Sequence, residues 1–69
     1  MPDLDVQLLA AHAADDRSAL VQLYTRAADR ADDIDAACFY LTHAYVFALE
    51  IADPSAAPLH ERLAAHGRV

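Results

Sequence analysis

The chain has 69 residues, among them seventeen Ala, nine Leu, one Gly and one Cys, and its eleven acidic and five basic residues give a formal charge of −6. This length limits it to one small domain. The scarcity of Gly excludes glycine-rich phosphate and dinucleotide loops, and the single Cys excludes disulfide frameworks and Cys-based zinc sites. The negative charge argues against nucleic acid and anionic membranes as partners.

Neither a membrane span nor a signal peptide is expected from the sequence. The longest apolar run, residues 36–49, is interrupted by Thr42 and His43, and it is shorter than the roughly 20 residues that cross a bilayer. The N-terminal residues Met1 to Asp5 are acidic, whereas a secretory signal is basic. We therefore expect a cytoplasmic protein that is complete from Met1. An Ala- and Leu-rich chain with few β-branched residues favours an all-α fold.

The first two predicted helices occupy residues 4–31. The first begins after Asp3, a favourable N-cap residue, carries its apolar residues on one side and runs to about Ala14. Asp15 or Asp16 caps the second, whose apolar residues follow helical spacing: Leu20, Leu23, Tyr24, Ala27, Ala28 and Ala31. Because residues 13–16 contain neither Gly nor Pro, a single continuous helix is the alternative.

The third predicted helix begins near Ile34, after Asp32 or Asp33, and is the most apolar. Its expected core stripe is Ile34, Cys38, Leu41, Tyr45, Ala48 and Leu49. Since Phe39, Val46 and Phe47 lie off this stripe, we expect more than one neighbour to cover the helix. Asp53 and Pro54 end it and open a fourth helix. That helix carries Leu59 and Leu63 and closes at Gly67, the expected left-handed residue.

These elements predict one helical domain over residues 1–69, built from two antiparallel hairpins at about 3–32 and 33–67. A shift of 37 positions places Asp16 on Asp53 and Ser18 on Ser55, as expected for two copies of a helical hairpin. The alternative is a small up-and-down bundle with no repeat.

The third helix carries a spaced set of residues at Cys38, Leu41–Thr42 and Tyr45. This spacing resembles the large apolar residue, Leu-Gly and Tyr on the first helix of a tetratricopeptide repeat, with Thr42 in place of Gly. Leu20, Tyr24 and Ala27 stand at the spacing of the second helix. The resemblance implies stacked antiparallel helix pairs, a protein-binding role and no catalysis. Two copies leave one end open for polar residues, another copy of the chain or a partner to cover.

No catalytic or metal-binding constellation is evident in the sequence, so we expect no enzyme, no cofactor and no metal. His60 and His66 are about 240° apart on a helix and cannot share a metal. Cys38 lies on the core stripe near acids, which disfavours a reactive thiolate. His43 interrupts an apolar helix, where it is either structural or lines a groove.

The aromatic residues indicate an interaction surface. Four of the five lie between Phe39 and Phe47 on the third helix, and we expect those that are not core to meet a partner. The expected function is a small protein-interaction module, an adaptor or subunit, that forms a homodimer. The alternative is a ligand- or metal-binding bundle that uses His43 and its aromatic neighbours. The predicted partner-binding residues are Phe39, Tyr40, His43, Val46 and Phe47.

Overall fold

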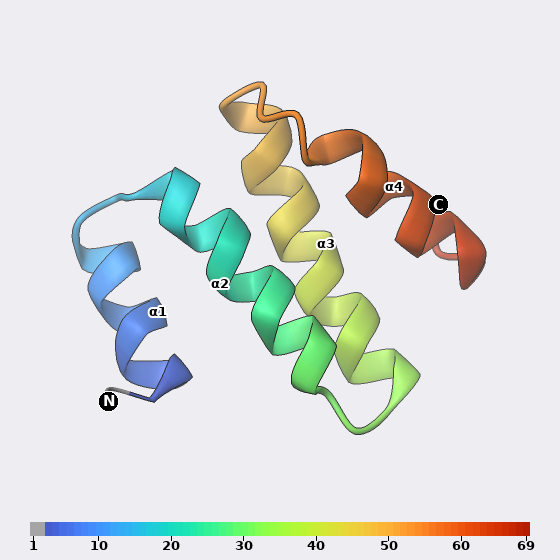
Figure 1. Cartoon of the computed structure of the whole chain (residues 1–69), viewed down its shortest axis with the longest axis horizontal. Helices are drawn as coiled ribbons and strands as arrows, with labels where there is room; N and C mark the ends of the chain where they lie inside the picture. Colours follow the sequence, from blue (N-terminus) through green and yellow to red (C-terminus); the bar gives the residue numbers. More distant parts are fainter. Residues whose placement is uncertain (1–2) are drawn as a thin grey trace.

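A computed structural model describes residues 3–69, which form four α-helices and no strand. The helices are α1 (Leu4–Ala13), α2 (Arg17–Arg30), α3 (Ile34–Glu50) and α4 (Ala56–Ala65). They confirm the all-α fold with two antiparallel hairpins. The helix backbones contact only their chain neighbours, α1 on α2, α2 on α3 and α3 on α4. The result is a flat arrangement, with Cα extents of 32 × 28 × 14 Å (Figure 1).

Aspartate side chains cap the first three helices. The carboxylates of Asp3, Asp16 and Asp33 accept hydrogen bonds from the backbone N–H groups three residues later, at 2.9, 3.1 and 2.8 Å. Each satisfies an N–H that has no partner inside its helix. The first cap is confirmed, and the choices left open at the second and third are resolved to Asp16 and Asp33.

The fourth helix begins later than the sequence suggested. The Asp53 carboxylate accepts hydrogen bonds from the backbone N–H and the hydroxyl of Ser55, at 2.9 and 2.7 Å. These bonds lower the pKa of Asp53, the hydroxyl contributing most. They hold a turn over residues 53–55, so α4 starts at Ala56 instead of Pro54.

Left-handed residues follow α1, α3 and α4. Asp15 and Ala52 both have φ 53°, and Gly67 has φ 70°. At each place the residue after the left-handed one donates its N–H to a carbonyl five residues back, at 2.9, 2.8 and 3.0 Å, which is the Schellman ending of a helix. Gly67 was expected in this role. The turn at Asp15 separates α1 from α2 and excludes one continuous helix.

The core consists of two buried clusters that share two aromatic side chains. The larger is formed by α2, α3 and α4 and includes Leu41 and Leu63, while the smaller is Ala11, Leu20 and Leu23. Tyr24 and Phe47 pack against both clusters. The side chain of Phe47 therefore joins the first hairpin to the second.

The core side of α3 differs from the predicted stripe at both ends. Ile34 and Leu49 are each 55% exposed, whereas Ala44, which was not assigned to the stripe, is completely buried. Because α2 and α4 both pack on α3, the buried side is centred on Leu41 and Ala48. Ile34 and Leu49 lie at the edges of that contact.

Replacing Ala52 by Gly is expected to raise the free energy of unfolding by about 1 kcal/mol. A Cβ in the left-handed conformation is strained, and Gly removes that strain. The matched control is Ala10→Gly on the exposed side of α1, where Gly in a helix interior lowers stability by about 0.5–1 kcal/mol. Urea unfolding of both variants measures the difference, and a loss of stability in Ala52→Gly contradicts the argument.

Candidate interaction surface on helix α3

One side of α3 carries apolar side chains that nothing else within residues 3–69 covers. Phe39, Val46 and Leu49 are 59%, 47% and 55% exposed, and Thr42 is exposed between them. The spacing of three, four and three residues places these side chains on one helix face. We call Phe39, Thr42, Val46 and Leu49 the α3 stripe. Because it belongs to a long, well-packed helix, it is a rigid surface.

Ion pairs close the α3 stripe at both ends. At the start of α3, Asp35 pairs with Arg68 of the C-terminal tail at 2.5 Å. At its end, Glu50 pairs with Arg17 of α2 at 2.9 Å. Both pairs are exposed, so neither contributes much to stability. They place a guanidinium group at each end of the stripe in a strongly acidic chain, and Arg17 also pairs with Asp15 at 3.7 Å.

A row of rings runs from the α3 stripe toward α1. The His43 ring lies 4.5 Å from Phe39 and 5.0 Å from Tyr24, on which it stacks, and Tyr24 stacks on Phe47 at 6.0 Å. His43 Nδ1 lies 2.8 Å from the Phe39 carbonyl oxygen. Since a carbonyl only accepts, Nδ1 is the donor in this contact.

Tyr24 is the centre of this row. Its hydroxyl is hydrogen-bonded to His12 Nε2 of α1 at 2.8 Å, while its ring contacts Tyr40, His43 and Phe47 of α3. Burial raises the pKa of Tyr24, and the nearby Tyr40 raises it further. Tyr24 therefore joins α1 to α3 through one hydrogen bond and three ring contacts.

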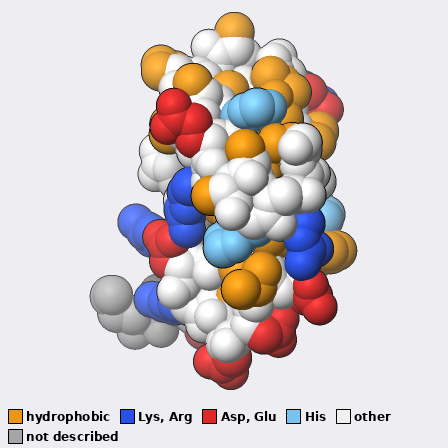
Figure 2. Space-filling view, turned by 90° about the vertical axis from the view of Figure 1, so that its right-hand side faces the viewer, with side chains coloured by type: hydrophobic (Ala, Val, Ile, Leu, Met, Phe, Trp, Pro, Cys, Tyr) orange, Lys and Arg blue, Asp and Glu red, His pale blue; other side chains and the backbone are white. Residues whose placement is uncertain are grey.

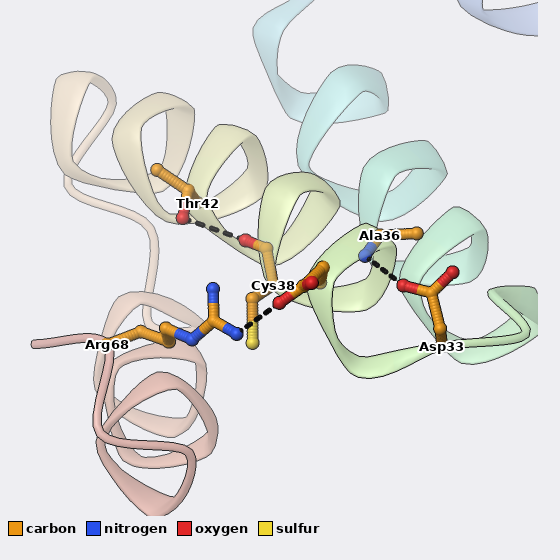
Figure 3. A network of polar contacts seen from close by, with 6 residues as sticks. Asp33, Ala36, Cys38, Thr42 and Arg68 are labelled. Carbon is orange, nitrogen blue, oxygen red and sulfur yellow. Dashed lines mark hydrogen bonds and ion pairs between the residues drawn. The ribbon is translucent and has the colours of Figure 1, made fainter.

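Two hollows adjoin the α3 stripe. The first, which we call the Cys38 hollow, is lined by Asp35, Cys38, Phe39, Thr42, His43 and Arg68. Figure 3 shows Arg68 reaching from the C-terminal tail toward Cys38 and the Thr42 hydroxyl donating to the Cys38 carbonyl, at 2.8 Å. The second, which we call the Val46 hollow, is lined by Thr42, His43, Val46 and Phe47.

The predicted partner-binding residues of α3 have two kinds of surroundings. Phe39 and Val46 are exposed on the α3 stripe. Tyr40, His43 and Phe47 are half-buried and contact Tyr24 of α2, so each also stabilises the fold. Leu49 was predicted to lie in the core, and its place on the stripe was missed. Helical spacing from Phe39 and Val46 was the signal that would have found it.

Three of the four histidines lie against tyrosine rings. The rings of His12 and His43 both contact Tyr24, and the ring of His60 on α4 lies 5.6 Å from that of Tyr45 on α3. Over residues 3–69 no three metal-ligating side chains come together. The edge formed by α4 and the C-terminus mixes hydrophobic, histidine and charged side chains of both signs (Figure 2).

Comparison with known proteins gives no family for this chain: no family model, curated protein or solved structure matches it. Among the described residues, no helix is both long and apolar enough to cross a bilayer.

The substitution Phe47→Ala is expected to lower the free energy of unfolding by about 2 kcal/mol, because this half-buried ring contacts both core clusters. Phe39→Ala removes a similar ring that is 59% exposed, and it should change stability by less than about 0.5 kcal/mol. Urea unfolding at low protein concentration compares the two variants. Equal losses would show that Phe39 also belongs to the core.

Ionisation of Tyr24 is expected to destabilise the chain at alkaline pH. Because its pKa is raised in the folded state, the neutral phenol contributes its full stabilisation below the ordinary pKa of about 10. This contribution is lost as the pH rises through the folded pKa. Urea midpoints measured from about pH 8 to pH 12 should fall less steeply in Tyr24→Phe than in the wild type. Parallel curves would contradict this.

Proposed function

We propose that the protein is a small protein-interaction module, an adaptor or subunit, and that it binds its partner through the α3 stripe. The observation that supports this is a rigid helix face whose aromatic and aliphatic side chains are uncovered, with a hollow beside it. Exposed aromatic anchors next to pockets contribute most of the binding energy in protein interfaces. The proposal includes no catalytic step.

The charge distribution favours a protein partner over nucleic acid or an anionic membrane. The formal charge is −6, and phosphate groups would be repelled. At the ends of the α3 stripe, Asp35 and Glu50 are paired with Arg68 and Arg17. An apolar face whose flanking carboxylates are paired suits another folded protein surface. A cytoplasmic location is part of the proposal and is compatible with the free, buried thiol of Cys38.

The likeness to tetratricopeptide repeats also belongs to this proposal. The turns after α1 and α3 have the same pair of backbone hydrogen bonds, around Asp15 and Ala52. These positions are related by the shift of 37 that matches Asp16 with Asp53. The correspondence supports descent of the two hairpins from one repeated unit, as in proteins that bind partners with stacked hairpins.

Self-association is the third part of the proposal. A chain this short buries little surface, and the α3 stripe leaves large side chains in water. A homodimer through this face would cover them.

Binding of a small ligand beside His43 is the alternative, favoured by the apolar Val46 hollow. A thermal-shift screen with divalent metals and common cofactors separates the two functions. Ligands that bind the folded state raise the melting temperature by mass action. We expect no shift, and a concentration-dependent increase that is lost in His43→Ala would support the ligand site instead.

Photo-crosslinking tests the proposed function directly. A photoreactive phenylalanine analogue at Phe39 is expected to form adducts with a protein, either another molecule or a second copy of the chain. The same analogue at Gln22, an exposed position on α2, is the matched control and should form none. Failure to crosslink at Phe39, or equal adducts at both positions, would contradict binding through the α3 stripe.

A further inference from the structure

We propose that the occupant of the α3 stripe is the α3 stripe of a second copy, packed antiparallel about a two-fold axis that passes between Thr42 and His43. This inference rests on the proposed use of the stripe as a binding surface and specifies its partner. It follows from the order in which projections, hollows and charges occur along α3.

The α3 stripe contains both a projection and a recess for it. Phe39 is the most exposed aromatic side chain of the described residues, at 59%. The Val46 hollow lies about two turns further along the helix and is lined by Thr42, His43, Val46 and Phe47. In a parallel pair Phe39 would face Phe39 and the hollows would face each other. Only an antiparallel pair places each Phe39 ring over the partner's hollow, twice by symmetry.

The position of the axis follows from this pairing. Phe39 and Val46 lie equally far, about 5 Å along the helix, on either side of the point between Thr42 and His43. Asp35 and Glu50 also lie equally far from the same point, at about 11 Å. The apolar stripe and its charged ends therefore share one centre, which is what an isologous interface requires.

The ion pairs then meet at the two ends of the interface. Asp35 with Arg68 of one copy would lie beside Glu50 with Arg17 of the other. Each end contains the three carboxylates of Asp15, Asp35 and Glu50 and the two guanidinium groups of Arg17 and Arg68, because Arg17 also pairs with Asp15 at 3.7 Å. The acids of the remaining chain are outside this contact, where salt at 0.1 M screens repulsion beyond about 10 Å. One unbalanced carboxylate at each end, on the exposed Asp15, leaves little repulsion across this dimer.

The contact involves about four turns of one helix per copy, which is small for a stable interface. We expect a dissociation constant in the range of about 10–100 μM. Sedimentation equilibrium between about 5 and 500 μM should then show a mass that rises from monomer to dimer. A monomer mass throughout overturns the inference. Protein adducts at Phe39 in that case still support the proposed function with a different partner.

Variants on two exposed apolar positions test the surface. Phe39→Asp is expected to weaken dimerisation at least about tenfold, since it removes both projections. Leu9→Asp is the matched control, because Leu9 is 71% exposed on α1 and lies off the proposed interface. Circular dichroism verifies that both variants fold. A dimer that survives Phe39→Asp, or is broken only by Leu9→Asp, overturns the assignment to α3.

A symmetric disulfide tests the axis. In a Cys38→Ala background, which removes the native thiol, Thr42→Cys places two thiols beside the proposed axis, within the roughly 4–7 Å Cα separation a disulfide needs. Mild oxidation should convert this variant to a covalent dimer at concentrations where Gln22→Cys, on α2, stays monomeric. If Thr42→Cys does not crosslink while the background chain still dimerises, the antiparallel arrangement is wrong.

Discussion

The packing of α2 against α3 is the contact on which the rest of the structure depends. The backbone of α1 meets only α2, and that of α4 meets only α3. Small side chains permit the central approach: Ala28 on α2 and Ala44 on α3 belong to one buried cluster and are at most 4% exposed. Leucines fill the remaining space, so the abundance of Ala in this chain produces close helix contacts instead of an empty core.

This sequential packing explains why α3 has an open side. The two neighbours, α2 and α4, cover one side of α3, and Arg62 of α4 reaches Asp29 of α2 to close that side with an ion pair at 2.6 Å. With four helices in a flat arrangement, no element remains to cover the opposite side. The exposed Phe39 and Val46 are therefore a consequence of the topology and not of a local packing defect. Their place between two balanced ion pairs makes them a defined surface.

Helix caps and helix endings, which depend on residues close in the chain, could be predicted from the sequence. The covered side of α3 could not, because it depends on how the helices are rotated against each other. Asp3 and Gly67 were assigned correctly, because caps and left-handed endings are set within one turn of helix. Ala52 was not expected in a left-handed turn, since Gly or Asn is the usual signal. Ile34 and Leu49 were placed in the core because their spacing fits. Which face of an apolar helix is covered depends on the positions of α2 and α4, and no local pattern encodes that.

The arrangement of the helices also decides which residues belong to the candidate site. Phe39 and Phe47 are chemically alike and eight residues apart, and both were predicted to bind a partner. The structure gives them different surroundings because Tyr24 stands beside Phe47 and links it to His12 of α1. A variant of Phe47 would therefore test stability, whereas a variant of Phe39 tests binding.

The positions of the acidic residues explain how a strongly acidic chain can also have an apolar surface. Asp3, Asp16 and Asp33 bind backbone N–H groups at helix starts, where the helix dipole favours negative charge. Asp35 and Glu50 are paired with arginines. Between those two pairs α3 carries no charged residue for fourteen positions, 36–49. The negative charge is thus concentrated at helix ends and turns, and the middle of the longest helix carries none.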